Sequence, residues 1–186
     1  MKQRYGRNTA KITSCATLTV ALTVTLSLGA ATTAHADYYS GGMPSRSFNV
    51  KAVGINDTWV GFLDRGRSNW NGSGAGTNIG RKSSAKATFT AGRYNESWYG
   101  LYSPSGFRPI NRIFAIKVNA KRLAEKSGSK MTEWCRSTTT HELGHALSLD
   151  DNPNTTKASL MKHNRNRATV QAPLSYDVSE VKRIYK

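Results

Sequence analysis

The chain reads His141-Glu-Leu-Gly-His-Ala-Leu-Ser-Leu-Asp-Asp151, and the first five residues of this run have the pattern H-E-x-x-H. We predict an α-helix from Met131 to about Leu147, so the pattern lies within a helix. Residues four apart in a helix lie on one face, one above the other. His141 and His145 can therefore reach one ion at about 2.0–2.1 Å, the usual Zn–N distance. The run predicts a metal site on a helix face.

Glu142 follows the first histidine and is turned by about 100° around the helix axis. From there its carboxylate does not easily become a ligand, but it can hydrogen-bond an attacking water. H-E-x-x-H on a helix is typical of zinc peptidases, in which the glutamate is the general base. The sequence therefore predicts Glu142 as the catalytic residue and Zn²⁺ as the cofactor.

Two histidines make an incomplete site, because catalytic zinc takes three protein ligands and keeps an open position. A third ligand must come from outside the five-residue pattern. The candidates are Asp150, Asp151, His163 and Glu180. The residues alone leave this choice open.

The surrounding sequence resembles the metzincin zinc peptidases, whose signature H-E-x-x-H-x-x-G-x-x-H/D has its last ligand at the position of Asp151. Ala158-Ser-Leu-Met161 is similar to the methionine turn of that superfamily, and 173–185 is similar to the final helix of matrixins, the interstitial-collagenase-like peptidases. An acidic third ligand is more like snapalysin, a small secreted bacterial metzincin. The resemblance implies that His141, His145 and Asp151 hold the zinc ion.

One position departs from this signature, because Ser148 stands where the family has glycine. The glycine lets the chain leave the helix and fold the third ligand back to the metal. A non-glycine residue at positive φ costs about 1–2 kcal/mol. Metal binding can outweigh this cost, since structural zinc contributes about 10 kcal/mol or more. We expect Asp151 as the ligand, with Glu180 (the gluzincin arrangement), His163 and Asp150 as alternatives.

Three further residues near the pattern have simpler interpretations. The resemblance implies that Met161 forms an apolar floor under the metal without binding it. We interpret His163 as a surface histidine and Cys135 as a small buried hydrophobic residue without a reactive thiol.

Hydrophobic patterning elsewhere predicts a sheet of short strands with helices packed on it. A first helix begins at an N-cap, Asp57 or Thr58, and ends near Trp70, and the residues between 119 and 131 read as a Lys/Ser/Gly loop. The other predicted elements are strands at 47–55, 77–80, 87–94, 98–103 and 112–119, and helices at 131–147 and 175–185. The fold class is therefore α+β and zincin/metzincin-like, a mixed twisted sheet of about five strands with three helices in a single domain.

Residues 1–36 have the composition of a secretory signal peptide. Four cations and no acid precede an apolar stretch from Cys15 to about Ala31, and Ala34-His-Ala36 is an A-x-A cleavage site. We expect cleavage after Ala36, which leaves a catalytic domain at 37–186 that is secreted and extracellular. No later stretch is apolar enough to span a bilayer, so we expect no membrane insertion after cleavage.

The chain is strongly basic, with 27 Lys and Arg against 11 Asp and Glu. Removing the leader takes away four cations and no acid, which leaves a net charge of +12. The cations are spread along the chain, so they indicate a solvated surface that can attract anionic cell-wall polymers. Nucleic-acid binding is not expected of an exported protein without a matching motif. We expect a monomer.

Together these features predict a secreted zinc metalloendopeptidase acting on proteins or peptides. Its substrate is expected to pair with an exposed strand, which the metzincin resemblance assigns to Trp98–Ser103. Two alternatives stay open: a wall-polymer-binding module with a non-catalytic zinc site, and a metallo-amidase directed at peptidoglycan.

Overall fold

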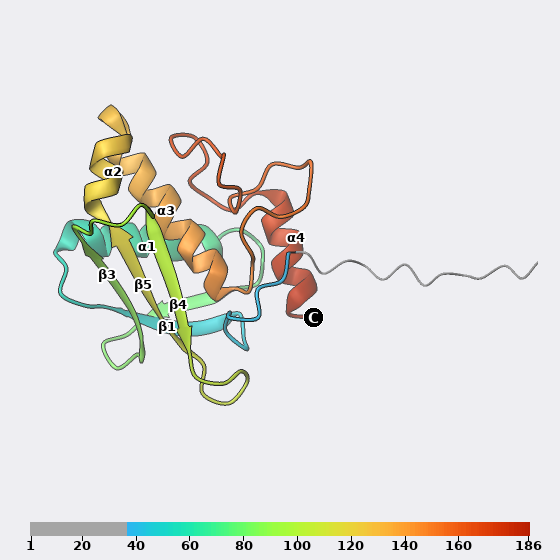
Figure 1. Ribbon diagram of the computed structural model, residues 1–186. Coiled ribbons are helices and arrows are strands. Elements are labelled where there is room, and N and C mark those ends of the chain that lie inside the picture. The colour runs from blue at the N-terminus through green and yellow to red at the C-terminus, as the bar shows by residue number, and fades with distance from the viewer. Residues whose placement is uncertain (1–36) are drawn as a thin grey trace, which may run out of the picture. The chain divides into compact units, whose positions relative to one another are not determined.

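Five strands and four α-helices follow one another along residues 37–186, the part of the chain that the computed structural model describes (Figure 1). The predicted leader at 1–36 lies outside the described residues. The strands are β1 (Ser47–Ala52), β2 (Asn78–Arg81), β3 (Ala87–Gly92), β4 (Gly100–Ser105) and β5 (Ile113–Asn119). The helices are α1 (Asp57–Asn71), α2 (Ala120–Lys126), α3 (Met131–Ala146) and α4 (Ser175–Ile184), and a 3₁₀ turn, Gly128–Lys130, precedes α3.

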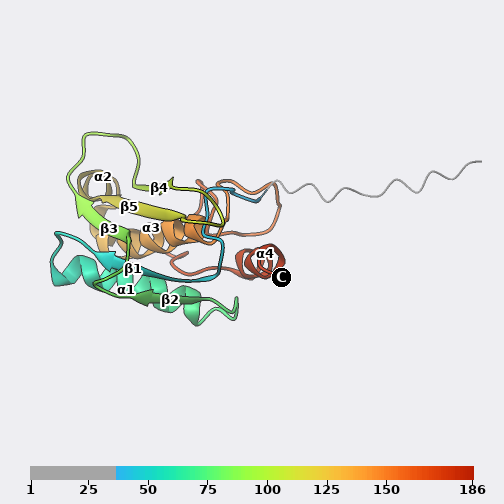
Figure 2. The same ribbon diagram turned by 90° about the horizontal axis from the view of Figure 1, so that it is seen from below.

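The strands form one mixed sheet in the order β2-β1-β3-β5-β4. The first four run parallel, and β4 runs antiparallel to β5 at one edge. α1 and α3 lie together on one face of this sheet (Figures 1 and 2). The predicted α+β class and mixed sheet are confirmed. The edge strand is also in the predicted place in the chain, although it covers 100–105 instead of 98–103.

The hydrophobic core fills the layer between the sheet and these two helices. Successive strand residues point to opposite faces, so every second residue of a strand can enter this layer. The buried hydrophobic residues of the strands are Phe48, Val50, Ile79, Ala87, Phe89, Tyr102, Phe114, Ile116 and Val118.

The start of α1 differs from the prediction by one or two residues. Neither Asp57 nor Thr58 is the N-cap, because the side-chain oxygen of Asn56 accepts a hydrogen bond from the N–H of Trp59 at 3.3 Å. Asn56 has an extended backbone, as N-cap residues do, and asparagine caps helices as well as aspartate does.

The contact between α1 and α3 depends on a small residue and a large one. At Gly66 an added Cβ would lie 3.1 Å from Leu143 and 3.2 Å from Thr139, so the missing side chain lets the two helices approach closely. One turn later, the buried indole of Trp70 donates a hydrogen bond to the carbonyl oxygen of Thr140 at 2.8 Å. These contacts fix where the second half of α3 lies.

The prediction of three helices and a loop after β5 is wrong, because α2 occupies Ala120–Lys126. Its residues are mostly strong helix formers, and the side chain of Asn119 accepts a hydrogen bond from the N–H of Arg122. Only Leu123 of this helix is buried. With a single apolar anchor in seven residues, the helix has no hydrophobic period that a sequence reading could detect.

α3 is the central helix of the domain. Its residues from Ser137 to Ala146 are all buried, whereas a surface helix buries only one stripe. Cys135 is fully buried in the core, so the prediction of a buried cysteine is confirmed, and burial raises the pKa of its thiol to about 12. No helix within residues 37–186 combines the length and apolar character that a membrane span needs.

A buried carboxylate attaches α4 to the loop that follows α3. Asp177 accepts hydrogen bonds from the hydroxyl of Ser159 at 2.5 Å and from the backbone N–H of Leu160 at 2.9 Å. It also accepts one from the N–H of Leu174 at 2.8 Å, at the start of its own helix. Asp177 therefore holds Ser159 and Leu160 in place, and the carbonyl oxygen of Leu160 in turn contacts His141 of α3.

We predict that Asp177→Ala lowers the free energy of unfolding by about 3 kcal/mol, because it leaves two buried donors and one partly buried donor without an acceptor. Chemical denaturation measured by circular dichroism checks this value. Glu96→Ala is the control: Glu96 is exposed, and its loss is expected to change stability by about 0.5 kcal/mol or less. Equal stability of the two variants would contradict the role of Asp177.

Candidate metal centre

His141 and His145 lie on one side of α3, with their ring centroids 4.9 Å apart. Nδ1 of His141 is 3.1 Å from the carbonyl oxygen of Leu160, and Nδ1 of His145 is 2.9 Å from that of Leu149. Because a carbonyl oxygen only accepts, each Nδ1 carries the proton and each Nε2 presents a lone pair. Burial lowers the pKa of His141 to about 3 and also lowers the pKa of His145, so both rings are neutral at pH 7.

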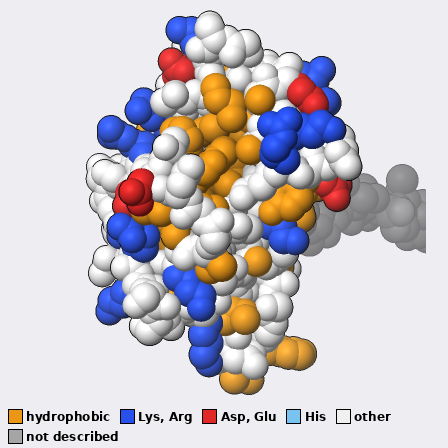
Figure 3. Space-filling model, turned by 90° about the vertical axis from the view of Figure 1, so that its left-hand side faces the viewer, with side chains coloured by type: hydrophobic (Ala, Val, Ile, Leu, Met, Phe, Trp, Pro, Cys, Tyr) orange, Lys and Arg blue, Asp and Glu red, His pale blue; other side chains and the backbone are white. Residues whose placement is uncertain are grey.

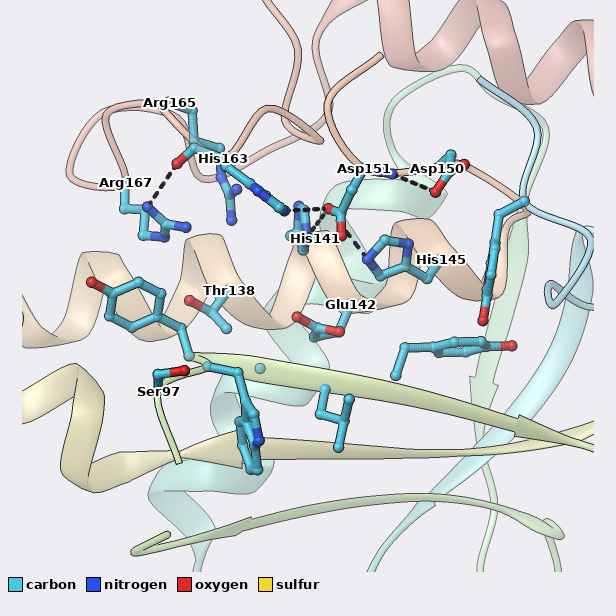
Figure 4. A pocket seen from close by; sticks show the side chains of 16 residues that line it. Ser97, Thr138, His141, Glu142, His145, Asp150, Asp151, His163, Arg165 and Arg167 are labelled. Carbon is cyan, nitrogen blue, oxygen red and sulfur yellow. Dashed lines mark hydrogen bonds and ion pairs between the residues drawn. The ribbon is translucent and has the colours of Figure 1, made fainter. Parts of the chain in front are cut away.

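The carboxylate of Asp151 lies close to the Nε2 atoms of both histidines. Its Oδ1 is 3.1 Å from Nε2 of His141 and 3.6 Å from Nε2 of His145, and the three side chains point to one spot (Figure 4). One ligand atom from each residue lies within 4.8 Å of the others. Asp151 Oδ1 is buried and receives no hydrogen bond from the described residues. Three acceptor atoms this close need a cation among them, and their chemistry is that of protein zinc ligands.

The alternative third ligands make other contacts. Asp150 accepts a hydrogen bond from the backbone N–H of Asp151 at 2.8 Å. Glu180 lies on α4 and forms an ion pair with Arg183. His163 is more than half exposed, as predicted, although its Nε2 comes within 3.1 Å of Asp151 Oδ1. Among the described residues, none of the three joins the cluster of atoms within 4.8 Å.

Ser148 makes the turn that brings Asp151 back to the helix. Its φ is +62°, so the left-handed conformation expected at this position is confirmed. The residue is fully buried, its Oγ lies 3.0 Å from the hydroxyl of Tyr185, and its carbonyl oxygen accepts a hydrogen bond from the N–H of Tyr39. A Cβ at Gly42 would lie 2.2 Å from the Ser148 hydroxyl, so a glycine there makes room for the serine.

Met161 packs against α3 close to the two histidines. Its side chain is 1% exposed, and a Cβ at Gly144 would lie 2.6 Å from its sulfur atom. The glycine of the pattern therefore lets the methionine approach the backbone between the histidines. The preceding residue, Leu160, supplies the carbonyl oxygen that orients His141. Met161 is therefore a buried residue beside the histidine pair, and the segment before it contacts His141.

Glu142 reaches from α3 toward the edge strand β4, where its carboxylate lies against Gly100 (Figure 4). A Cβ at Gly100 would be 2.3 Å from its Oε1 atom, so only glycine leaves room for the carboxylate. Burial, together with the nearby Asp151, raises the pKa of Glu142 to about 8. Gly100 was not among the predicted site residues. A glycine inside a predicted edge strand, here 98–103, indicates that another group approaches the backbone closely, but it does not indicate which group.

These residues line a cleft of about 730 Å³ between α3, β4 and the loop that follows α3 (Figure 4). β4 and the segment before it form one side, and the cluster forms the other. Besides the residues already described, the cleft is lined by Ser97, Trp98, Tyr99, Leu101, Tyr102, Thr138, Arg165 and Arg167. The cluster is therefore open to a ligand that enters along the edge strand.

No protein family model matches the chain, and no curated protein matches it. Among solved structures it is similar to a chain of the ECX AB5 holotoxin in its GM1-bound form, with a TM-score of 0.60 and 13% identity over 82% of this chain and 85% of that one. Myroilysin has a TM-score of 0.51 and 13% identity over 80% of this chain and 97% of its own. The archaemetzincin of Methanopyrus kandleri has a TM-score of 0.49 and 12% identity over 78% and 96%.

At these identities the first two likenesses show a shared fold and no more. The chain therefore has a zincin-like, metzincin-like fold, as predicted. The narrower resemblance to matrixins gains no specific support from these structures.

We predict that Asp151→Ala lowers zinc affinity by far more than the 10–100-fold that loss of a supporting residue causes. Glu180→Ala is the matched control, since its carboxylate pairs with Arg183 and lies outside the cluster, so it should retain zinc normally. Metal analysis after dialysis against a weak chelator measures both. A site emptied by Glu180→Ala but not by Asp151→Ala would exclude this ligand set.

Proposed function

We propose that this chain is a secreted zinc-dependent metalloendopeptidase that hydrolyses peptide bonds in proteins or peptides. The observation that carries the proposal is the meeting of His141, His145 and Asp151 in a cleft, next to the buried carboxylate of Glu142. Three neutral or anionic donors with a carboxylate beside them match the residue types of a catalytic zinc site.

His141, His145 and Asp151 would hold the Zn²⁺ ion. When bound, zinc polarises a carbonyl group and lowers the pKa of water from 15.7 toward about 7. The carbonyl oxygens of Leu160 and Leu149 keep both Nε2 lone pairs directed at the site. Within residues 37–186 no fourth protein ligand joins the cluster, which fits a catalytic site better than a structural one.

Glu142 has the role of general base. Burial raises the pKa of this group, but a cation held by the three neighbouring ligands would favour its ionised form, which can take a proton from the attacking water. The same group would then deliver the proton to the nitrogen of the leaving amine, so it acts first as base and then as acid. Gly100 allows the carboxylate to lie between α3 and β4. In this position it faces the cleft that an extended substrate would occupy.

An extended peptide is the form of substrate that suits this cleft. β4 pairs with β5 along one side only, and within residues 37–186 no strand pairs with its other side. The free N–H and C=O groups of such an edge can add a peptide as one more strand. Gly100, Leu101 and Tyr102 of this strand all line the cleft.

The position of Glu142 also helps to compare the peptidase with the two alternative functions, a wall-polymer-binding module and a peptidoglycan-directed metallo-amidase. A wall-polymer-binding module would have no use for a carboxylate held beside the cluster. Lys and Arg side chains are spread over the face shown in Figure 3, around a band of hydrophobic side chains, without one concentrated basic patch. A metallo-amidase would use the same chemistry on peptidoglycan, so only the choice of substrate separates it from a peptidase.

We predict that Glu142→Ala lowers kcat on an unfolded protein substrate by about 10²–10⁴-fold while zinc content and melting temperature are kept, because only proton transfer is removed. Gly100→Ala should lower kcat in the same way, since its Cβ displaces the carboxylate. Peptide release from casein, stopped by a chelator and restored by zinc, measures the activity.

The matched control for the second variant is Gly61→Ala, because a Cβ at Gly61 on α1 meets no atom within 4 Å. It should keep full activity. Retention of more than a few per cent of activity in Glu142→Ala would exclude this residue as the base. Cleavage of purified peptidoglycan but not of casein would favour the amidase.

We predict in addition that the extracellular protein begins at Asp37, because the A-x-A site ends at Ala36. The intact mass of protein from the culture medium measures this. Retention of the first residues would mean that the segment is a membrane anchor and not a signal peptide.

A further inference from the structure

Two arginines of the loop after Met161 line the cleft beside the metal centre. Figure 4 shows Arg165 and Arg167 on the Thr138 side of Glu142. Arg165 is 9% exposed, and Arg167 is partly buried. Buried arginines are unusual unless an anion pairs with them. Their presence at one end of a substrate cleft therefore needs an explanation.

Arg165 is held firmly by neutral groups. Its Nε donates to the hydroxyl of Ser137 at 3.2 Å, and its Nη1 donates to the carbonyl oxygen of Lys162 at 3.0 Å. Within residues 37–186 it forms no ion pair within 4.0 Å. Burial and the neighbouring charge of Arg167 lower the pKa of Arg165 to about 9, so it is still a cation at pH 7.

Arg167 is oriented by aromatic rings. Its guanidinium carbon lies 4.6 Å from the ring centre of Tyr99 and 5.5 Å from that of Trp134, and its Nη1 donates to the carbonyl oxygen of His163 at 3.2 Å. Its Nε is buried and has no hydrogen-bond partner among the described residues. Arg167 also forms no ion pair with the described residues. The guanidinium is thus fixed in direction while its charge is unmatched.

The acids of the cleft do not neutralise this pair. The carboxylates that line it are Glu142, Asp150 and Asp151. In the proposed function, Asp151 faces the metal and Glu142 moves the proton, and Asp150 accepts from the backbone N–H of Asp151. The arginine end of the cleft therefore keeps an excess of positive charge toward a bound substrate.

We propose that Arg167, supported by Arg165, is a specificity-determining residue that binds the carboxylate of an Asp or Glu side chain of the peptide substrate. The inference rests on the proposed function and adds the substrate class to it. A planar guanidinium donates two parallel hydrogen bonds to a carboxylate, and the stacking on Tyr99 holds it ready for this geometry. An acidic side chain would also supply the anion that this end of the cleft lacks.

The position of the acidic residue follows from helix and strand geometry. Thr138, which lies near the arginines, precedes Glu142 by one helical turn, or about 6 Å along the axis. An extended peptide advances about 3.3 Å per residue. The recognised carboxylate is therefore expected within about two residues of the bond that is cleaved.

The test begins with a peptide library whose cleavage products are sequenced, which identifies the residues around the cleaved bond. Two peptides of equal net charge are then compared at 0.15 M salt. The first peptide has Glu at the position that the library identifies and Gln at its far end. In the second peptide these two residues are exchanged. Equal net charge removes the general attraction of an acidic peptide to a basic protein.

We predict that the kcat/KM of wild type for the first peptide is about tenfold or more above its kcat/KM for the second. A charge-assisted hydrogen bond is strong enough to produce a difference of this size. Arg167→Met should bring this ratio close to 1, and Arg167→Lys should give an intermediate ratio because it keeps the charge without the planar fork. Arg65→Met is the matched control, since Arg65 is exposed on α1 outside the cleft. It should keep the wild-type ratio.

A wild-type ratio of 1 or less, or an unchanged ratio in Arg167→Met, would overturn the inference. If wild type cleaves both peptides at equal rates and Glu142→Ala cleaves neither, the proposed peptidase function holds. Only the recognition of an acidic side chain is then excluded. If neither peptide is cleaved, the proposed function fails. Recognition of the carboxylate is then tested separately by calorimetry, which measures the Kd of each peptide for zinc-loaded Glu142→Ala. Equal Kd values for the two peptides would then exclude recognition of the carboxylate.

Discussion

The structure depends on one electrostatic constraint, which is that three acceptor atoms meet without a proton between them. Each histidine donates a hydrogen bond from its Nδ1–H to a backbone carbonyl oxygen, so both Nε2 lone pairs face Asp151 Oδ1, which is itself buried. Such an arrangement is unfavourable until a cation binds. The rest of the domain supplies the rigidity that keeps these atoms together: α3 is buried, and α4 holds the segment of Leu160 through Asp177.

Several of the decisive contacts depend on the absence of a side chain. Gly66 lets α1 reach α3, Gly144 lets Met161 reach the helix between the histidines, and Gly100 leaves room for the carboxylate of Glu142. In each case the glycine makes space for another residue's side chain, far away in the sequence. At Ser148 the opposite holds, because a non-glycine residue keeps the left-handed turn while its hydroxyl contacts Tyr185.

The cleft brings together chemistry and recognition from different parts of the chain. The proposed metal ligands come from α3 and the residues just after it, whereas the two arginines come from the loop beyond Met161, and Arg167 is oriented by Tyr99 and Trp134. A cation site beside Asp151 and an unpaired guanidinium beside Tyr99 would attract different parts of one substrate.

The sequence by itself determined the features that follow from local geometry. Spacing of four residues puts His141 and His145 on one helix face, but the residues alone left the third ligand open. Only the resemblance to the metzincin signature implied Asp151 and a left-handed turn at Ser148, and the structure brings Asp151 to the two histidines. Only the tertiary structure decided the contacts of Gly100 and the direction of Arg167, and it revealed α2, whose one buried residue gave no periodic signal. The reason is physical: a helix fixes neighbours three and four residues apart, whereas contacts between distant segments exist only once the core has packed.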